Sequence, residues 1–282
     1  MASNDSIKKT LLVAVALCIV CSLASNDSIK KTLLVAVALC IVCSLVVSGA
    51  AVLLKPAQVK NKALDRKSNI LAAAGMLEPG QSSAEIEEKF VSRITPKIVD
   101  IEAGRYTTEL GVANFEQRKV AKNPETSTDL GDADDVANIS RREDYAIVYL
   151  VETDGKLDKI ILPVHGYGLW STLYGFLALE ADLNTIAGFG FYEHGETPGL
   201  GGEVDNPKWK DQWSGKVVYD EGEVAIKVVK GSVDTGKSGA EHQVDGLSGA
   251  TLTSNGVTNL LKFWLGEMGY KKFLTNLKSG EA

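Results

Sequence analysis

The hydrophobic pattern of the N-terminal part is a long run without charge. Leu33–Leu54 covers 22 positions with no charged side chain. As a helix it would extend about 33 Å, which matches a hydrocarbon core of about 30 Å. We therefore expect a transmembrane helix over residues 32–54. A cleaved signal peptide ending near Ser48-Gly49-Ala50 is the alternative, because small residues suit a cleavage site.

Flanking charges bear on how such a helix would be oriented. Lys30 and Lys31 precede the apolar run, and basic residues favour the cytoplasmic side of a membrane. Lys55, Lys60 and Lys62 follow the run and weaken this preference. On balance the pattern predicts a cytoplasmic N-terminus, with everything after residue 54 on the opposite side.

The apolar run belongs to the second copy of an identical repeat. Residues 2–23 recur without change as residues 24–45. Because natural repeats diverge, an identical copy indicates a recent duplication or an artefact of sequence assembly. The first copy has an apolar run of 13 residues, Leu11–Leu23, or about 20 Å of helix, too short to span a bilayer. We treat residues 1–31 as a lead outside the fold.

The rest of the chain, residues 55–282, alternates between helical and strand periodicities. Helical spacing occurs over 60–74, 84–94 and 270–277, and strand patterns over 97–103, 145–151, 157–164, 172–180, 185–192 and 224–229. Thr153-Asp154-Gly155-Lys156 is typical of a hairpin turn. Residues 126–138 are acidic and rich in Ser and Thr, which predicts an exposed loop. Strands in hairpins predict an α+β domain with an antiparallel sheet.

A strong amphipathic helix is predicted near the C-terminus. Its apolar stripe has spacings of three and four and comprises Val257, Leu260, Leu261, Trp264, Leu265 and Met268. Thr253, Ser254 and Asn255 are each suitable N-cap residues. Trp209 and Trp213, four residues apart after Pro207, predict a second helical face that packs on the core.

Seven small or polar residues precede this helix. The run Asp245-Gly246-Leu247-Ser248-Gly249-Ala250-Thr251 allows the backbone to approach a ligand closely, because Gly and Ala add little bulk. A helix start also offers free N–H groups and the positive end of a dipole. The run therefore predicts either a phosphate site beside the Thr251 hydroxyl or a polar turn that only caps the helix.

Two glycine-rich loops follow predicted strands. These are His165–Trp170 and Glu196–Gly202. Backbone amides in such loops can face a ligand, and Trp170 and Leu200 can cover a flat ring. The alternative is that both loops are tight hairpin exits in which glycine supplies a positive φ.

Cysteine usage and charge limit the chemistry. All four cysteines, Cys18, Cys21, Cys40 and Cys43, lie in the apolar repeats, where thiols behave as small apolar groups. The C-x-x-C pairs also allow a cluster shared with partner subunits. The net charge is −6, and −8 after residue 54, which argues against nucleic acid as a partner. The dispersed histidines and the missing G-x-S-x-G motif give no support to a zinc site or a hydrolase.

Asp245–Thr251 resembles the flavinylation motif of FMN-binding domains. The resemblance implies that a flavin transferase joins FMN through its phosphate to the Thr251 hydroxyl, beside Ser248, Gly249 and Ala250. The loop Glu196–Gly202 resembles the segment of the same family that lies against the flavin ring. It implies ring contacts from Thr197 and Leu200, with Glu196 and Trp170 as further candidates.

From Ala24 onward, the order of these features resembles the C-subunit family of the bacterial Na⁺-translocating NADH:quinone oxidoreductases. The G-type protein of the Rnf electron-transport complex is a near relative of that family. The resemblance implies a single-pass protein of the bacterial inner membrane with a periplasmic FMN domain at 55–282. Its partners would be the bilayer, the flavin transferase and the other subunits of a complex that oxidises NADH, reduces ubiquinone and exports Na⁺.

Within such a complex Thr251 would be a tether and the domain an electron relay, with no catalytic acid or base. A membrane-anchored module that binds a phosphate ligand without moving electrons is the alternative from another class of function.

Overall fold

The computed structural model describes residues 28–282, so the predictions for the first repeat copy lie outside the described residues. The chain divides into two units at Lys62–Ala63. Helix α2 (Ile29–Ala73) contains the uncharged run and has Pro56 inside it. Among the described residues it is the one helix long and apolar enough to cross a membrane, and that stretch is not buried by protein. The span 32–54 remains a prediction.

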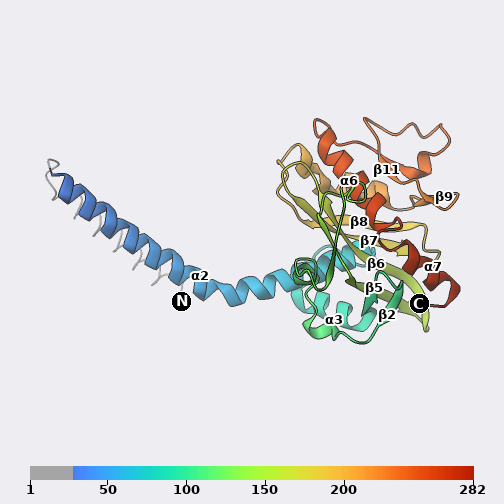
Figure 1. The fold of residues 1–282 in the computed structure, drawn as a ribbon, viewed down its shortest axis with the longest axis horizontal. Coiled ribbons are helices and arrows are strands. Elements are labelled where there is room, and N and C mark those ends of the chain that lie inside the picture. Colours follow the sequence, from blue (N-terminus) through green and yellow to red (C-terminus); the bar gives the residue numbers. More distant parts are fainter. Residues whose placement is uncertain (1–27) are drawn as a thin grey trace. The chain divides into compact units, whose positions relative to one another are not determined.

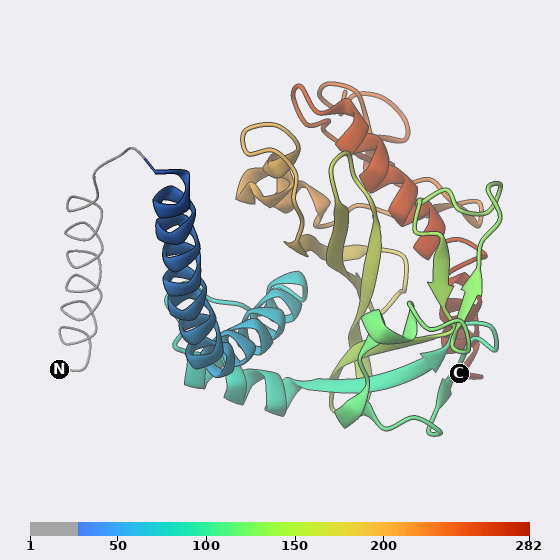
Figure 2. The same cartoon turned by 60° about the vertical axis from the view of Figure 1, so that its left-hand side comes forward.

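The unit from Ala63 onward is built on a six-stranded sheet with the order β2-β1-β5-β6-β7-β8 (Figures 1 and 2). Every neighbouring pair in it is antiparallel. The strands are β1 (Ile94–Asp100), β2 (Arg105–Thr107), β5 (Tyr145–Thr153), β6 (Lys156–Tyr167), β7 (Thr172–Glu180) and β8 (Ile186–Glu193). This arrangement confirms the predicted α+β class with an antiparallel sheet.

This unit also contains helices, 3₁₀ turns and short strands outside the sheet. The helices are α3 (Ser83–Arg93), α4 (Gln117–Val120), α5 (Pro207–Lys210), α6 (Thr251–Trp264) and α7 (Lys271–Ser279), with 3₁₀ turns η1 (Val112–Asn114), η2 (Gly201–Asp205), η3 (Asp211–Trp213) and η4 (Ala240–His242). The short strands are β3 (Ser127–Asp129), β4 (Arg141–Glu143), β9 (Tyr219–Asp220), β10 (Glu223–Val224), β11 (Lys227–Val228) and β12 (Gln243–Val244).

Both faces of the sheet are buried, and strand alternation divides them. On β5, Val148 and Leu150 belong to the core that also contains apolar residues of α6 and α7. Their neighbours Ile147 and Tyr149 belong to a second core, which contains Ile86 of α3 and the end of α2. Because side chains alternate across a strand, one buried strand can serve two cores. The apolar run 145–151 therefore lacks a polar face.

The hairpin between β5 and β6 has the predicted two-residue turn. Thr153 pairs with Lys156, and Asp154 and Gly155 between them have φ values of 53° and 72°. Two positive φ values define the type I′ geometry that Asp-Gly favours, because its twist matches that of the strands. This local signal is therefore sufficient to place the hairpin.

Two predicted segments differ from the structure. Residues 126–138 are not simply an exposed loop, because β3 pairs with β4 and both Leu130 and Ala137 are buried. Residues 224–229 form no continuous strand. The N–H groups of Ala225 and Ile226 both donate to the Val218 carbonyl, which bends the backbone between β10 and β11.

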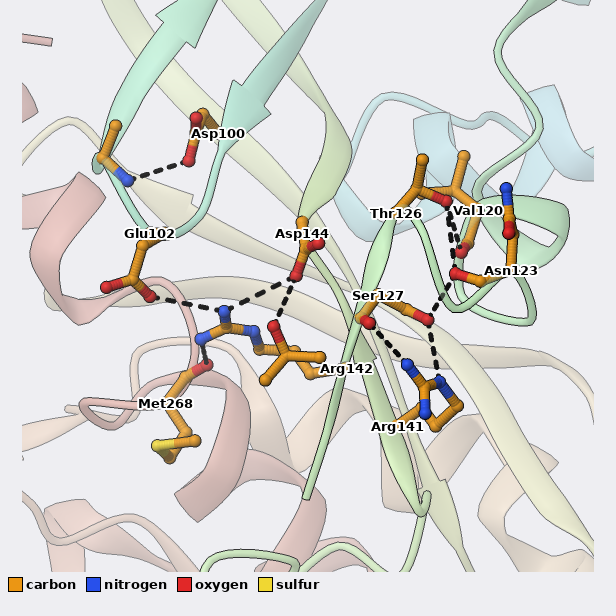
Figure 3. Close-up of polar contacts among 12 residues, drawn as sticks. Asp100, Glu102, Val120, Asn123, Thr126, Ser127, Arg141, Arg142, Asp144 and Met268 are labelled. Carbon is orange, nitrogen blue, oxygen red and sulfur yellow. Dashed lines mark hydrogen bonds and ion pairs between the residues drawn. The ribbon is translucent and has the colours of Figure 1, made fainter.

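Two arginines of β4 stabilise the β3–β4 segment, Arg142 by contacts with the rest of the domain and Arg141 by contacts within the segment (Figure 3). Arg142 is buried and donates to the Met268 carbonyl at 3.1 Å, with the carboxylates of Glu102 and Asp144 at 3.4 and 3.8 Å. Arg141 donates to the carbonyl and hydroxyl oxygens of Ser127. A charged side chain is rarely buried without such partners. Ionic and hydrogen bonds therefore hold this segment where few apolar side chains are available.

Helix α6 lies against β6 through positions that lack side chains. A Cβ on Gly256 would lie 2.4 Å from the Tyr167 carbonyl oxygen, and one on Gly166 would lie 2.5 Å from Cβ of Leu260. The backbones are therefore closer than any larger residue allows. This contact determines where the start of α6 lies relative to the loop after β6.

Replacing Gly256 by Ala should destabilise the domain even though Ala is the better helix former by about 1 kcal/mol. The added methyl group meets backbone atoms of Tyr167 and Gly168, and these cannot shift without moving the end of β6. We expect a loss of about 1–3 kcal/mol in chemical denaturation of the detergent-solubilised chain. The exposed neighbour Asn255 provides the control, since Asn255→Ala should change stability by no more than about 0.5 kcal/mol. Equal or greater stability of Gly256→Ala would contradict the close contact.

Candidate functional site

The small-residue run before α6 is held in place by its first two residues. The indole N–H of Trp209 donates to the Asp245 carbonyl at 2.8 Å, and the Asp245 carboxylate accepts the Val233 N–H at 2.7 Å. The N–H of Gly246 donates to the Gly231 carbonyl at 2.8 Å. A Cβ at Gly246 would lie 2.3 Å from the Val229 carbonyl oxygen, so only glycine fits there. Trp209, which is buried against Trp213 as the predicted helical face requires, thus supports the start of the run.

Helix α6 begins earlier than its cap signals predict. Its N-cap is Ala250, which has no side chain to accept a hydrogen bond, and Thr251 is the first helical residue. Thr253 and Ser254 lie inside the first turn because their hydroxyls serve contacts with other segments. Thr253 donates to Glu196 at 2.7 Å, and Ser254 accepts the Leu247 N–H at 3.1 Å. Tertiary contacts therefore override the capping preference.

The uncapped start leaves backbone donors available. Within the described part of the chain, the N–H groups of Thr251, Leu252 and Thr253 have no acceptor, whereas that of Ser254 donates to Ala250. Free N–H groups at the positive end of a 14-residue helix form an anion-binding environment. This helix start therefore offers hydrogen-bond donors to an anion, and the phosphate site itself stays a prediction.

The hydroxyls around this helix start fall into two groups. Those of Thr253 and Ser254 are buried and hydrogen-bonded, so neither is available for reaction. Those of Thr251 and Ser248 are exposed and make no hydrogen bond among the described residues. Of these two, only Thr251 lies on the helix itself. The structure thus distinguishes Thr251 from the hydroxyls two and three residues further along.

Glu196 is a buried residue next to this helix start, and its carboxylate lies inside the protein. The residue is 5 % exposed. One carboxylate oxygen accepts the N–H groups of Leu169, Trp170 and Ser171 at 3.0, 2.9 and 3.2 Å, and the other accepts the Thr253 hydroxyl at 2.7 Å. The site therefore connects three segments that are far apart in sequence.

The environment of Glu196 favours its ionised form. Burial by itself raises the pKa of this carboxyl, but hydrogen bonds from Trp170, Thr253, Leu169 and Ser171 outweigh burial and hold the pKa below its usual range. No ion pair involves Glu196 among the described residues. Peptide dipoles, rather than a cation, therefore stabilise the negative charge.

The three segments that meet at the site each carry an exposed apolar side chain. Trp170 is 66 % exposed, Leu252 59 % and Leu200 44 %. Leu200 lies against the small-residue run, because a Cβ on Gly249 would be 2.9 Å from its Cδ2 atom. Exposed apolar side chains gathered beside free backbone donors are typical of a cofactor site with an apolar ring and an anionic end.

The other predicted residues also belong to this region. Thr197 is exposed, and its carbonyl accepts the N–H groups of Leu200 and Gly202, which folds the loop between them into a tight turn with Gly199 at φ 77°. Ser248 and Gly249 are exposed, whereas Ala250 is buried. The fold thus brings the predicted residues together from the loops after β6 and β8 and from the start of α6.

Two participants are not predicted from the sequence. Leu252 is five residues before Val257 and therefore off the apolar stripe of α6, a signal that could have identified it as a surface contact. The sequence around Thr253 indicates a cap residue and nothing more. Its hydrogen bond to Glu196, 57 residues away, leaves no local signal.

Comparison with known proteins agrees with this geometry. Residues 168–266, which include the end of the first glycine loop, all of the second loop and α6, match the FMN-binding domain family. Fold and site together define an FMN-binding domain behind a helix long enough to cross a membrane. The chain is 59 % identical, over the full length of both proteins, to the C subunit of the Na⁺-translocating NADH-quinone reductase from Pseudomonas aeruginosa. It is 49 % identical to the corresponding protein from Vibrio alginolyticus, over 99 % of this chain and 98 % of the relative.

The chain belongs to the C-subunit family of the Na⁺-translocating NADH-quinone reductases, which confirms the family predicted from the motifs and makes it part of an oxidoreductase complex. The crystal structure of Shewanella oneidensis NqrC resembles the domain with a TM-score of 0.70 and 39 % identity, over 79 % of this chain and 99 % of that one. FMN is thus the cofactor class of the domain.

The contact between Gly249 and Leu200 is open to a double-mutant test. Gly249→Ala should destabilise the protein by about 1–2 kcal/mol, because the residue has a φ of 71° that disfavours a side chain. The methyl group also meets Leu200, so Leu200→Ala should relieve part of the loss. We expect a coupling of at least about 0.5 kcal/mol in denaturant unfolding. Strictly additive effects would show that the two residues do not touch.

Proposed function

We propose that this chain carries FMN as a phosphoester on Thr251 and relays electrons within the Na⁺-translocating NADH-quinone reductase complex. The observation that carries the proposal is the exposed and unbonded hydroxyl of Thr251 at an uncapped helix start. It lies in the run Asp245–Thr251, whose resemblance to a flavinylation motif is the sequence argument for a covalent link.

The free donors of α6 support the placement of the phosphate. The N–H groups of Thr251, Leu252 and Thr253 have no acceptor among the described residues, and a phosphate diester is an anion. The backbone of Ser248, Gly249 and Ala250 adds little bulk beside the attachment point. We assign Ser248–Thr251, with Thr251 as the acceptor, to the phosphate end of the cofactor.

The apolar surface beside α6 supports the placement of the ring. Trp170 and Leu200, together with Leu252 and the exposed loop residue Thr197, would line the isoalloxazine. When bound, FMN supplies the capacity to take up and release electrons. The residues of the chain orient it and need to supply no catalytic acid or base.

Covalent attachment suits a domain that is held to a membrane. A tether retains the cofactor, and the membrane helix keeps the domain close to the other subunits, so electron transfer needs no bimolecular search. The NADH and quinone reactions named for the relatives would occur elsewhere in the complex. A flavin transferase must reach the Thr251 hydroxyl during maturation, which its exposure permits.

The attachment site can be tested by substitution. Thr251→Ala should abolish flavin fluorescence of the protein band in a denaturing gel, because no hydroxyl remains to form the ester. Ser248→Ala should keep the fluorescence, since that hydroxyl lies outside the helix. Mass analysis of the peptide containing residue 251 should show FMN minus water in the wild type. A fluorescent band from Thr251→Ala would refute the assignment.

We further propose that α2 crosses the bacterial inner membrane over residues 32–54 and places residues 55–282 in the periplasm. In a chain whose four native cysteines are replaced by serine, a cysteine at exposed Ser279 should then react with a membrane-impermeant maleimide in intact cells. A cysteine at Lys30 is the matched control and should react only after lysis. The reverse labelling pattern would show the opposite orientation.

A further inference from the structure

We infer that Glu196 is a positioning residue of the flavin site: its ionised carboxylate holds the Trp170 loop and the Leu200 loop on the start of α6 and lowers the potential of the bound flavin. The inference rests on the proposed function for the flavin part. Its structural part stands on the hydrogen bonds alone. It assigns Glu196 a role that acts through the two loops rather than a contact with the flavin.

Both oxygens of the carboxylate accept hydrogen bonds from inside the protein. One oxygen accepts three consecutive N–H groups, from Leu169 to Ser171, and the other accepts the Thr253 hydroxyl. Bonds to an ionised acceptor are roughly twice as strong as neutral ones. Four such bonds from two other segments make Glu196 the link between the three parts of the site.

Glycines of both loops lie directly beside the carboxylate. A Cβ on Gly168 would lie 2.7 Å from one carboxylate oxygen, and a Cβ on Gly201 would lie 2.7 Å from the other and 2.6 Å from the Thr253 hydroxyl. A side chain at either glycine would therefore displace the carboxylate or the Thr253 hydroxyl from this arrangement. These two glycines come from the two loops that the sequence singled out as candidate cofactor loops.

The carboxylate positions the loop that carries the exposed side chain of Trp170. Trp170 has its N–H bound inside while its indole is exposed, so the carboxylate fixes the backbone from which the ring projects. Ser171 adds a second link, since its hydroxyl accepts the Gly195 N–H at 2.6 Å. Loss of the carboxylate should release residues 169–171 from the start of α6.

The negative charge of Glu196 should also change the midpoint potential of the flavin, which a neutral hydrogen-bonding side chain would not do. Reduction adds negative charge to a flavin, and a nearby buried anion opposes this. The lowered pKa of Glu196 keeps that anion present at neutral pH. Neutralising it should therefore raise the flavin midpoint potential.

Amide hydrogen exchange of residues 169–171 tests the structural part on flavin-free protein, prepared as the full chain with Thr251→Ala. Glu196→Gln in that background should accelerate exchange by about fivefold or more, because the amides lose a charged acceptor. Thr253→Val should accelerate it less, and Thr253→Ser should restore wild-type protection. Glu203→Gln is the matched control, since the Glu203 carboxylate accepts a hydrogen bond from Asn206 and none from residues 169–171. Unchanged exchange in Glu196→Gln would refute the link.

Potentiometry of the flavin-loaded full chain tests the electrostatic part. Glu196→Gln should keep the flavin in the denaturing gel while its potential shifts upward, whereas Glu203→Gln should shift it little. A wild-type potential in a Glu196→Gln protein with accelerated exchange would refute the role toward the flavin. If the wild type carries no attached flavin, the proposed function fails, and the exchange experiment still decides whether Glu196 holds the loops.

Discussion

The site depends on a single buried carboxylate. Glu196 comes from the loop after β8, its hydrogen-bond donors come from the loop after β6 and from α6, and no cation lies among its described partners. Burial of an anion is costly unless hydrogen bonds replace its hydration. Here the donors are peptide groups and one hydroxyl, so the cost is offset only when three distant segments have reached their native positions.

Close backbone packing makes that arrangement possible. Gly256 lets α6 approach the end of β6, and Gly168 and Gly201 leave room for the carboxylate between the loops. The start of α6 is thereby presented without a side-chain cap, with Thr251 exposed at its first position. The same features that deny α6 a local cap make it suitable for the phosphate of a ligand. Local stability and the proposed binding function thus compete at this helix end.

Membership of the C-subunit family connects this site to a membrane complex. Under the proposed function, the glycine loops and the start of α6 hold the flavin. Helix α2 then keeps that flavin beside the partner subunits. The domain contains no cysteine, since all four lie at or before Cys43. The domain thus offers no thiolate ligand, and the cofactor class that its family match supports is FMN.

The sequence alone determined the features that depend on near neighbours. The apolar run of α2, the Asp154-Gly155 hairpin and the stripe of α6 follow from periodicity and turn preference, and the motif ending at Thr251 was recognisable by itself. Only the tertiary structure decided the start of α6, the ordered β3–β4 segment and the roles of Thr253 and Glu196. These depend on hydrogen bonds between residues tens of positions apart, and such contacts leave no periodic signal in the chain.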